Sequence, residues 1–285
     1  MQTLSHWPYD ARRRIIGVFT DIDDTLTIHQ AITLDALQAL SDLKAAGLAV
    51  IPITGRPVGW CEPHALGDAA RGLPKWSVDA MVAENGGVAF VPDVASKNGL
   101  QPLYSKREQI LKAYFSDATS RRANQLKMQQ VAQRMLREVP GSAISRDAAG
   151  RETDIAIDYA EHVLLPPDKV AQVVALMQSE GMQATVSSIH INGWFGRHNK
   201  LEAARWMVRL LFDRHLDDEI GRWVYVGDST NDQIMFEHFP HSVGVANIHR
   251  FENQLVHWPR YETQGERGAG FAEVVRAILD ARTAR

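Results

Sequence analysis

Residues 15–25 read Ile-Ile-Gly-Val-Phe-Thr-Asp-Ile-Asp-Asp-Thr, an apolar run that ends abruptly in three carboxylates. The first six residues are apolar and rich in β-branched side chains, which is typical of a strand buried in a parallel sheet. Asp21, Asp23 and Asp24 follow where such a strand would end. Open parallel sheets bind their ligands beyond the carboxyl ends of the strands, so this stretch predicts both a sheet and the place of its site.

Short apolar runs of this kind alternate with predicted helices toward both ends of the chain. Four leucines between Thr33 and Gly47 recur at helical spacing, with Thr33 as the N-cap. Further buried strands are predicted at residues 48–53, 80–83, 223–226 and 242–245, and further helices at 200–212 and around 271–278. Strands that alternate with helices in this way predict an α/β class with a doubly wound parallel sheet.

The middle of the chain has a different sequence pattern from the two ends, with a long polar helix and an alternating strand in place of continuous apolar strands. Glu84-Asn85-Gly86-Gly87 is a turn-forming cluster that would suit a hinge. The capping-box pattern Ser105-x-x-Glu108 predicts a long polar helix ending near Val139. Residues 155–159 alternate apolar and polar side chains, which predicts a strand with one solvent-exposed face. We therefore predict a discontinuous α/β core formed by residues 1–87 and 190–285, and an inserted α+β cap formed by residues 88–189.

Composition narrows the class of protein. The 285 residues include 31 Lys and Arg against 34 Asp and Glu, with no basic block, so nucleic acid is not an expected partner. The apolar runs fall short of the roughly 18 residues of a membrane helix, and no membrane association is expected. Cys61 is the single cysteine, which excludes an internal disulfide and fits a reducing compartment. We expect a cytoplasmic protein.

Polar residues end several of the predicted strands or begin the next helix. Thr54-Gly55-Arg56 follows the strand at 48–53, Lys200 begins a helix, and Asp228 and Asp232 follow the strand at 223–226. Each cluster alone is compatible with a turn, a helix cap or a solvated loop. Three carboxylates within residues 21–24 repel one another and favour a bound cation. Oxygen ligands of this kind suit Mg²⁺, which commonly also binds substrate phosphate.

In these clusters the chain resembles the haloacid dehalogenase superfamily of phosphohydrolases. It is similar to subfamily IIB, the Cof-type and sucrose-phosphate phosphatase-like group, which carries a large α/β cap between its second and third motifs. Glu84-Asn85-Gly86 looks like the sequence that precedes this cap. The four motifs stand here as Asp21-Ile22-Asp23-Asp24-Thr25, Thr54, Lys200 and Gly227-Asp228-Ser229-Thr230-Asn231-Asp232.

The resemblance implies a phosphatase that works through an aspartyl-phosphate. Asp21 would be the nucleophile, since a carboxylate that attacks phosphorus divides one difficult displacement into two easier ones. Asp23 would protonate the leaving alkoxide and then deprotonate the attacking water. Thr54, with Gly55 and Arg56, and Asn231 would bind phosphoryl oxygens, and Lys200 would offset their charge. The Mg²⁺ ligands would be Asp21, the main-chain carbonyl of Asp23, and Asp228, with Asp232 behind them.

The cap of this subgroup selects the leaving alcohol, and the fourth motif resembles that of sucrose-phosphate and mannosyl-phosphoglycerate phosphatases. A phosphorylated sugar or glycoside is therefore the expected substrate. The candidate cap contacts are His190, Asn192 and Trp194. Trp194 and Phe195 fit an interdomain core equally well. Arg146 and Arg151 would meet a second anionic group of the substrate or lie in a solvated loop.

Three other functions use similar residues. A phosphotransferase or phosphomutase would pass the phosphoryl group from the same aspartate to a second alcohol. A non-hydrolytic protein would bind the phosphorylated ligand only. A signalling receiver domain also places acidic residues, a hydroxyl and a lysine around Mg²⁺, but it is shorter and carries its acceptor after the third strand.

Overall fold

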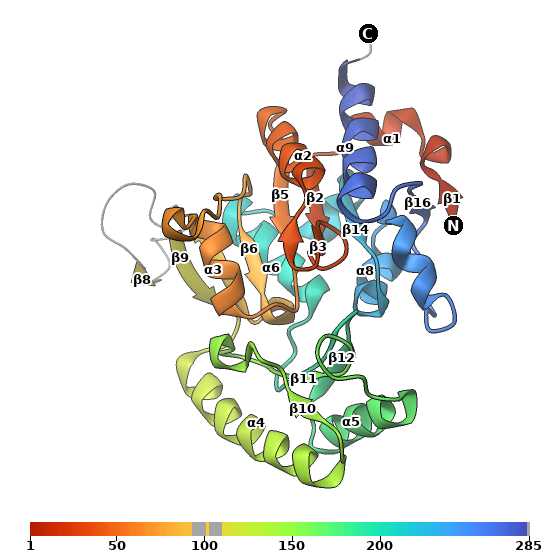
Figure 1. Cartoon of the computed structure of the whole chain (residues 1–285). Coiled ribbons are helices and arrows are strands. Elements are labelled where there is room, and N and C mark those ends of the chain that lie inside the picture. The colour runs from red at the N-terminus through yellow and green to blue at the C-terminus, as the bar shows by residue number, and fades with distance from the viewer. Residues whose placement is uncertain (93–100, 103–109, 284–285) are drawn as a thin grey trace.

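The computed structural model describes residues 1–92, 101–102 and 110–283. Its central sheet confirms the predicted α/β class, with six strands that pair in parallel throughout. Figure 1 shows this core above a smaller cap. In spatial order the strands are β1 (Gln2–Thr3), β16 (Tyr261–Glu262), β15 (Ser242–Gly244), β14 (Trp223–Gly227), β2 (Gly17–Thr20) and β5 (Ala49–Pro52).

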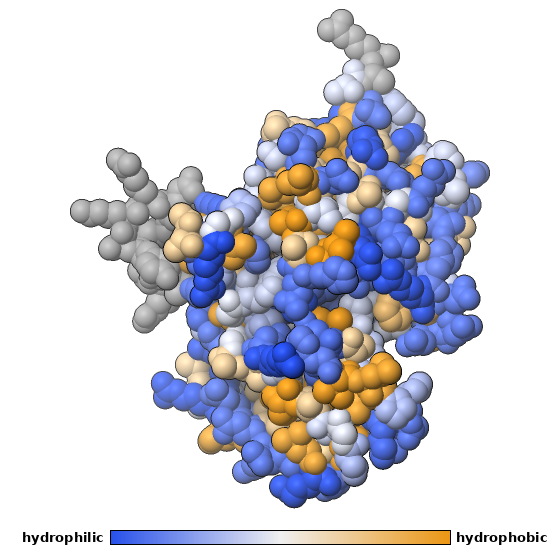
Figure 2. All heavy atoms as spheres, in the orientation of Figure 1, coloured by the Kyte–Doolittle hydropathy of each residue, from blue (hydrophilic) through white to orange (hydrophobic). Residues whose placement is uncertain are grey.

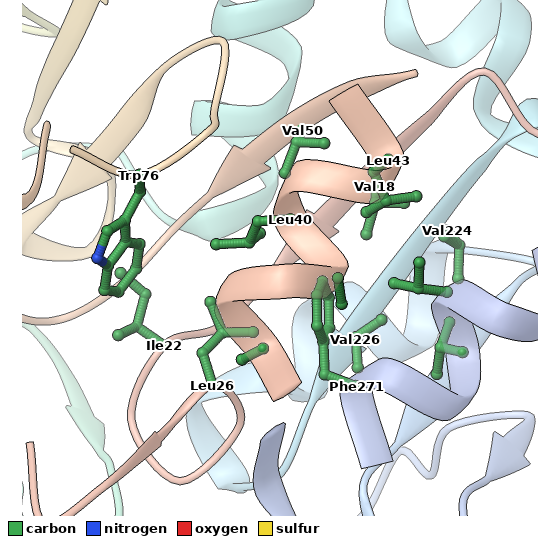
Figure 3. Close-up of a cluster of buried hydrophobic side chains, with 14 of the residues drawn as sticks. Val18, Ile22, Leu26, Leu40, Leu43, Val50, Trp76, Val224, Val226 and Phe271 are labelled. Carbon is green, nitrogen blue, oxygen red and sulfur yellow. The ribbon is translucent and has the colours of Figure 1, made fainter. Parts of the chain in front are cut away.

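Helices cover both faces of this sheet. One face packs against α1 (Tyr9–Arg13), α2 (Leu34–Ala45) and α9 (Arg267–Thr283), and the other against α6 (Lys200–Phe212), α7 (Leu216–Glu219) and α8 (Gln233–His238). On the first face, Val18 lies with Leu40 and Phe271 in one cluster (Figure 3). The next residue, Phe19, lies in the cluster of the opposite face. Burial on both faces explains why these strands are continuous apolar runs.

Short 3₁₀ helices join many of these elements. They are η1 (Leu4–His6), η2 (Ala69–Arg71), η3 (Glu84–Gly86), η5 (Ala148–Gly150), η6 (Ile220–Arg222), η7 (Thr230–Asp232) and η8 (Ala246–Phe251). A small hairpin, β3 (Thr27–Ile28) and β4 (Ala31–Ile32), follows the aspartate loop. His29 and Gln30 at its turn have positive φ angles of 48° and 68°, as two-residue hairpin turns require.

An antiparallel sheet extends the core beyond β5 and α3 (Val58–Leu66). Its strands are β6 (Met81–Ala83), β7 (Val88–Pro92), β9 (Ile110–Tyr114) and β8 (Gln101–Pro102), and a parallel bridge between Ile53 and Val82 joins it to β5. The strands β7 and β9, which the predicted boundary assigns to the cap, thus pair on the core side; the boundary itself stays a prediction.

The long polar helix begins later than predicted. Ser105 and Glu108 lie outside the described residues, and residues 110–114 form β9. The helix is α4 (Ala118–Glu138), and its N-cap is Asp117, whose side chain accepts the backbone N–H of Ser120 at 2.9 Å. Pairing of β9 with β7 takes residues 110–114 out of the helix.

The cap is an antiparallel sheet covered on one face by α4 and α5 (Pro167–Ser179). Its strand order is β10 (Ala143–Ile144), β11 (Ile155–Asp158), β13 (His190–Trp194) and β12 (Gln183–Val186). Ile157 and Ile191 pack under the helices. The opposite face, where Asp158 pairs with His190, is buried as well. The predicted solvent-exposed face is therefore wrong, because this polar face lies against the core.

In Figure 2 hydrophilic side chains predominate on the right-hand side of the core, and apolar side chains gather on the cap and over the middle of the core. Among the helices of the described ranges, none combines the length and the apolar character that crossing a bilayer requires.

Candidate active site

The strands β2, β5 and β14 are neighbours, so the residues that follow them meet at one edge of the sheet. The backbone N–H of Asp21 donates to the carbonyl of Val226 at 2.8 Å, and that of Ile53 donates to Thr20 at 2.8 Å. These bonds hold the aspartate loop between the loops after β5 and β14. The sheet thereby brings together residues that are about 30 and 200 positions apart in sequence.

Lys200 lies at the centre of this edge. Its Nζ donates to Oδ1 of Asp21 at 2.7 Å and to Oδ1 of Asp232 at 2.7 Å, and the three side chains are almost completely buried. Burial opposes the charge on Lys200, but the two carboxylates raise its pKa above the ordinary value. Burial raises the pKa of Asp21 to about 7, and Lys200 acts in the opposite direction.

The residues around Asp228 fit a divalent cation. Carboxylate oxygens of Asp21, Asp228 and Asp232 lie within 4.8 Å of one another. Both oxygens of Asp232 are occupied: Oδ1 accepts from Lys200 and Tyr225, and Oδ2 from the backbone N–H of Asp228 at 2.9 Å. Burial and the charge of Asp21 raise the pKa of Asp228 well above its ordinary value. An all-oxygen donor set with excess negative charge suits Mg²⁺, and Asp21 and Asp228 could hold it.

Asn247 joins this site although the sequence analysis missed it. Its Nδ2 donates to Oδ2 of Asp228 and to the carbonyl of Asp24, both at 2.9 Å. Its Oδ1 accepts the backbone N–H of Arg267 at 2.9 Å. Asn247 follows the strand β15 by three residues, so the same rule of polar residues after strand ends would have found it.

The loop after β5 is held by bonds within the loop and to the aspartate loop. The Thr54 hydroxyl is buried beside the aspartate loop and accepts the backbone N–H of Arg56 at 3.1 Å. The guanidinium of Arg56 pairs with Asp23, with Nε 2.8 and 2.9 Å from the two carboxylate oxygens. Asn231 accepts the Ser229 hydroxyl at 2.9 Å. Contact of Arg56 and Asn231 with phosphate stays a prediction.

The cap reaches this loop through Gly55. The carbonyl of Gly55 accepts from Arg151 at 3.0 Å and from Asn192 at 3.4 Å. The Arg151 guanidinium is buried and is also paired with Asp147 and Asp154, so its charge is already neutralised. This arrangement favours a role for Arg151 in holding the core loop over contact with a second anion.

His190, Asn192 and Trp194 are also buried. Trp194 is 1% exposed, its Nε1 donates to the carbonyl of His198 at 2.8 Å, and its ring stacks on that of His198. This favours the packing alternative for Trp194. His190 is bonded to Glu161 through Nε2 at 2.9 Å. Arg146 lies exposed on the surface of the cap.

A cavity of about 350 Å³ lies between core and cap beside Asp23. Its lining includes Asp23, Arg56 and Arg267 from the core, and Glu161, His162 and Ser188 from the cap. None of the described residues that line it is Trp, Tyr or Phe. The space next to the aspartate loop is therefore rich in hydrogen-bonding groups.

Glu84, in the predicted hinge cluster, binds backbone groups of both core and cap. Its carboxylate, which is completely buried, accepts the backbone N–H of Val58 at 3.1 Å and that of Glu152 at 3.0 Å, and both N–H and hydroxyl of Thr153 at 2.5 Å. Burial and the nearby charge of Asp154 raise the pKa of Glu84 to about 7. The predicted hinge cluster is thus a fixed point of contact between the cap and the loop after β5.

No family model and no curated protein matches the sequence. Solved structures do match over nearly the whole chain. The sucrose-phosphatase of Synechocystis, solved with sucrose and phosphate, is 18% identical, with a TM-score of 0.61 over 94% of this chain and 98% of that one. An HAD/COF-like hydrolase from Plasmodium vivax is 15% identical, with a TM-score of 0.65 over 96% and 99%. A haloacid dehalogenase-like hydrolase from Bacteroides thetaiotaomicron is 14% identical, with a TM-score of 0.59 over 93% and 99%. The chain therefore has the fold of the haloacid dehalogenase-like hydrolases, a doubly wound α/β core with an inserted cap.

Proposed function

We propose that the protein is a Mg²⁺-dependent phosphatase that hydrolyses a small phosphomonoester through an aspartyl-phosphate. The observation that carries the proposal is the buried group of Asp21, Asp228 and Asp232 around Lys200, at the strand ends of a fold shared with hydrolases.

The residues divide the reaction into two displacements. In the first, a carboxylate oxygen of Asp21 attacks phosphorus, the bond from phosphorus to the alcohol oxygen breaks, and Asp23 gives its proton to that oxygen. In the second, Asp23 takes a proton from water, the water oxygen attacks phosphorus, and the bond to Asp21 breaks. Lys200, the Thr54 hydroxyl and the loop at Gly55 would balance and orient the phosphoryl oxygens.

The charges near Asp21 support a metal requirement. Lys200 binds two of the three buried carboxylates, so the site carries excess negative charge before a phosphate enters. Bound at Asp21, Asp228 and the carbonyl of Asp23, Mg²⁺ would neutralise phosphoryl oxygens and align them for in-line attack. Asp232 would hold Lys200 and the loop after β14.

The cavity supports a phosphorylated sugar or glycoside as substrate. Its size suits a small polar molecule, and its lining offers hydroxyl, carboxylate, imidazole and guanidinium groups to an alcohol that carries several hydroxyls. The shared fold with a sucrose-phosphatase is consistent with this class. We place the protein in the cytoplasm, where a buried, unpaired thiol such as Cys61 stays reduced.

The test is phosphate release from a panel of sugar phosphates, phosphorylated glycosides, nucleotides and aryl phosphates, with Mg²⁺ and with chelator. We expect metal-dependent release that is strongest for one sugar phosphate and absent in Asp21→Asn. Asp10→Asn, on the exposed surface of α1, is the matched control and should retain full activity. Release that requires an added alcohol acceptor would favour a phosphotransferase or mutase. Phosphate binding without any turnover would favour a binding protein.

A further inference from the structure

Glu161 is the cap carboxylate that faces the aspartate loop across the cavity. Its loop follows β11 and is fixed by Asp158, whose carboxylate accepts the backbone N–H groups of Glu161 and His162 at 3.0 Å. The Glu161 side chain is 13% exposed and lines the cavity. The backbone around it thus holds this carboxylate at one place on the cap.

Besides its neighbour His162, whose Nε2 lies 3.8 Å from Oε2, three side chains contact the Glu161 carboxylate. From the cap, Nε2 of His190 lies 2.9 Å from Oε2. From the core, Gln30 at the β3–β4 turn donates to Oε1, and a terminal nitrogen of Arg56 lies 3.8 Å from the same oxygen. Glu161 therefore contacts both the cap sheet and two loops of the core.

Arg56 connects Glu161 to Asp23. Its guanidinium is nearly buried, lies 5.4 Å from the centre of the Trp60 ring, and binds both oxygens of Asp23. The nitrogens that face Asp23 and the one that faces Glu161 belong to the same planar group. A planar guanidinium with partners on two sides has a fixed orientation, and the carboxylate that it binds shares that orientation.

We propose that Glu161 is a positioning residue, which acts through Arg56 to hold the Asp23 carboxylate at the leaving-group oxygen when the cap is seated on the core. The inference rests on the proposed function, in which Asp23 transfers the proton. It makes proton transfer depend on a residue of the other domain, so the acid is fully oriented only around an enclosed substrate.

The test compares two esters of similar shape, phenyl phosphate and p-nitrophenyl phosphate, because the more basic phenolate needs the acid and the nitrophenolate hardly does. In Glu161→Gln we expect kcat/KM for phenyl phosphate to fall at least about tenfold, whereas kcat/KM for p-nitrophenyl phosphate changes less than about threefold. The ratio kcat/KM is compared because it excludes the second displacement, in which Asp23 acts as a base and which the two esters share. The matched control is Glu152→Gln. That cap carboxylate pairs with Lys112 at 2.6 Å, does not line the cavity, and should leave both esters unaffected.

An equal loss of kcat/KM for the two esters would overturn the inference, since it would mean that Glu161 only holds the cap against the core. If Glu161→Gln lowers the melting temperature, Glu161→Asp, which withdraws the charge from Arg56, provides the same comparison.

A double-mutant cycle with Arg56→Lys, measured on the sugar phosphate that the panel selects, is a second test. Glu161→Gln should have little further effect in the Arg56→Lys background, and fully additive losses would overturn the route through Arg56. A wild-type protein that turns over nothing would instead overturn the proposed function and the inference with it.

Discussion

The burial of His198 predicts how the free energy of unfolding depends on pH, and the size of the effect follows from the structure. His198 lies between the cap strand β13 and the core helix α6 and is 3% exposed. Neither of its ring nitrogens has a hydrogen-bond partner among the described residues. Its ring packs on Trp194 at 5.4 Å and Phe115 at 5.8 Å. Burial lowers the pKa of His198 to about 4 from an ordinary value of 6.5. As the pH falls from 6.5 towards 4, His198 becomes protonated in the unfolded chain but stays neutral in the folded chain. The free energy of unfolding therefore decreases, by about 3 kcal/mol in all.

The perturbation is His198→Phe, which keeps an aromatic ring in the stack and removes the titrating group. Urea unfolding of both proteins is measured between about pH 7.5 and about pH 4.5, and the free energy of unfolding of the variant is subtracted from that of the wild type. Subtraction cancels the opposing contributions of Asp21 and Glu84, which both proteins share. The difference should be constant above about pH 7 and fall by about 2.5 kcal/mol at about pH 4.5. Parallel curves over this range would refute the reasoning.

Two further predictions concern the acidic site. Lys200→Met leaves two buried carboxylates unpaired, so we expect the free energy of unfolding to fall by about 3–5 kcal/mol and kcat by about 10²–10³-fold. Tyr225→Phe, which removes only one hydroxyl from Asp232, should cost about 1 kcal/mol, and equal losses in urea unfolding of the two variants would contradict this assignment. Mg²⁺ should raise the melting temperature of the wild type, with about 2.7 kcal/mol of added stability at 100 times its Kd. The same titration of Asp228→Asn should give a much smaller rise, and an unchanged response would remove Asp228 from the metal ligands.

The core could be predicted because its strands are buried on both faces. Residues 48–53 and 223–226 are short apolar runs for that reason, and each is followed at once by the polar residues of the site. A strand that needs no polar face leaves a clear local signal, and its end marks the edge where ligands bind. Asp21, Thr54 and Asp228 could therefore be grouped from sequence positions alone.

The cap could not be predicted in the same way. The alternation in residues 155–159 gives the correct strand, but it cannot tell whether the polar side faces water or another domain. Asp154 and Asp158 are buried and bind groups outside the strand β11, Asp154 the side chain of Asn192 and Asp158 the backbone of Glu161, and the alternation does not encode these contacts. The start of α4 was mistaken because Asp117 and Ser105 are both good N-caps, and only the pairing of β9 with β7 distinguishes them.

Arg56 has a partner that its sequence position does not indicate. Its place after β5 predicts a phosphate ligand, and that contact stays a prediction; in the structure a carboxylate on the neighbouring loop offers the guanidinium two parallel acceptors, which is the geometry that arginine prefers. With Arg56 paired to Asp23, and Arg151 paired to Asp147 and Asp154, Lys200 is the buried cation that binds Asp21 among the described residues. Lys200 is itself shared between two carboxylates, so it cannot by itself balance a phosphate dianion. Because Arg56 already binds a carboxylate, the proposed divalent cation at Asp228 is the charge that would balance the phosphate.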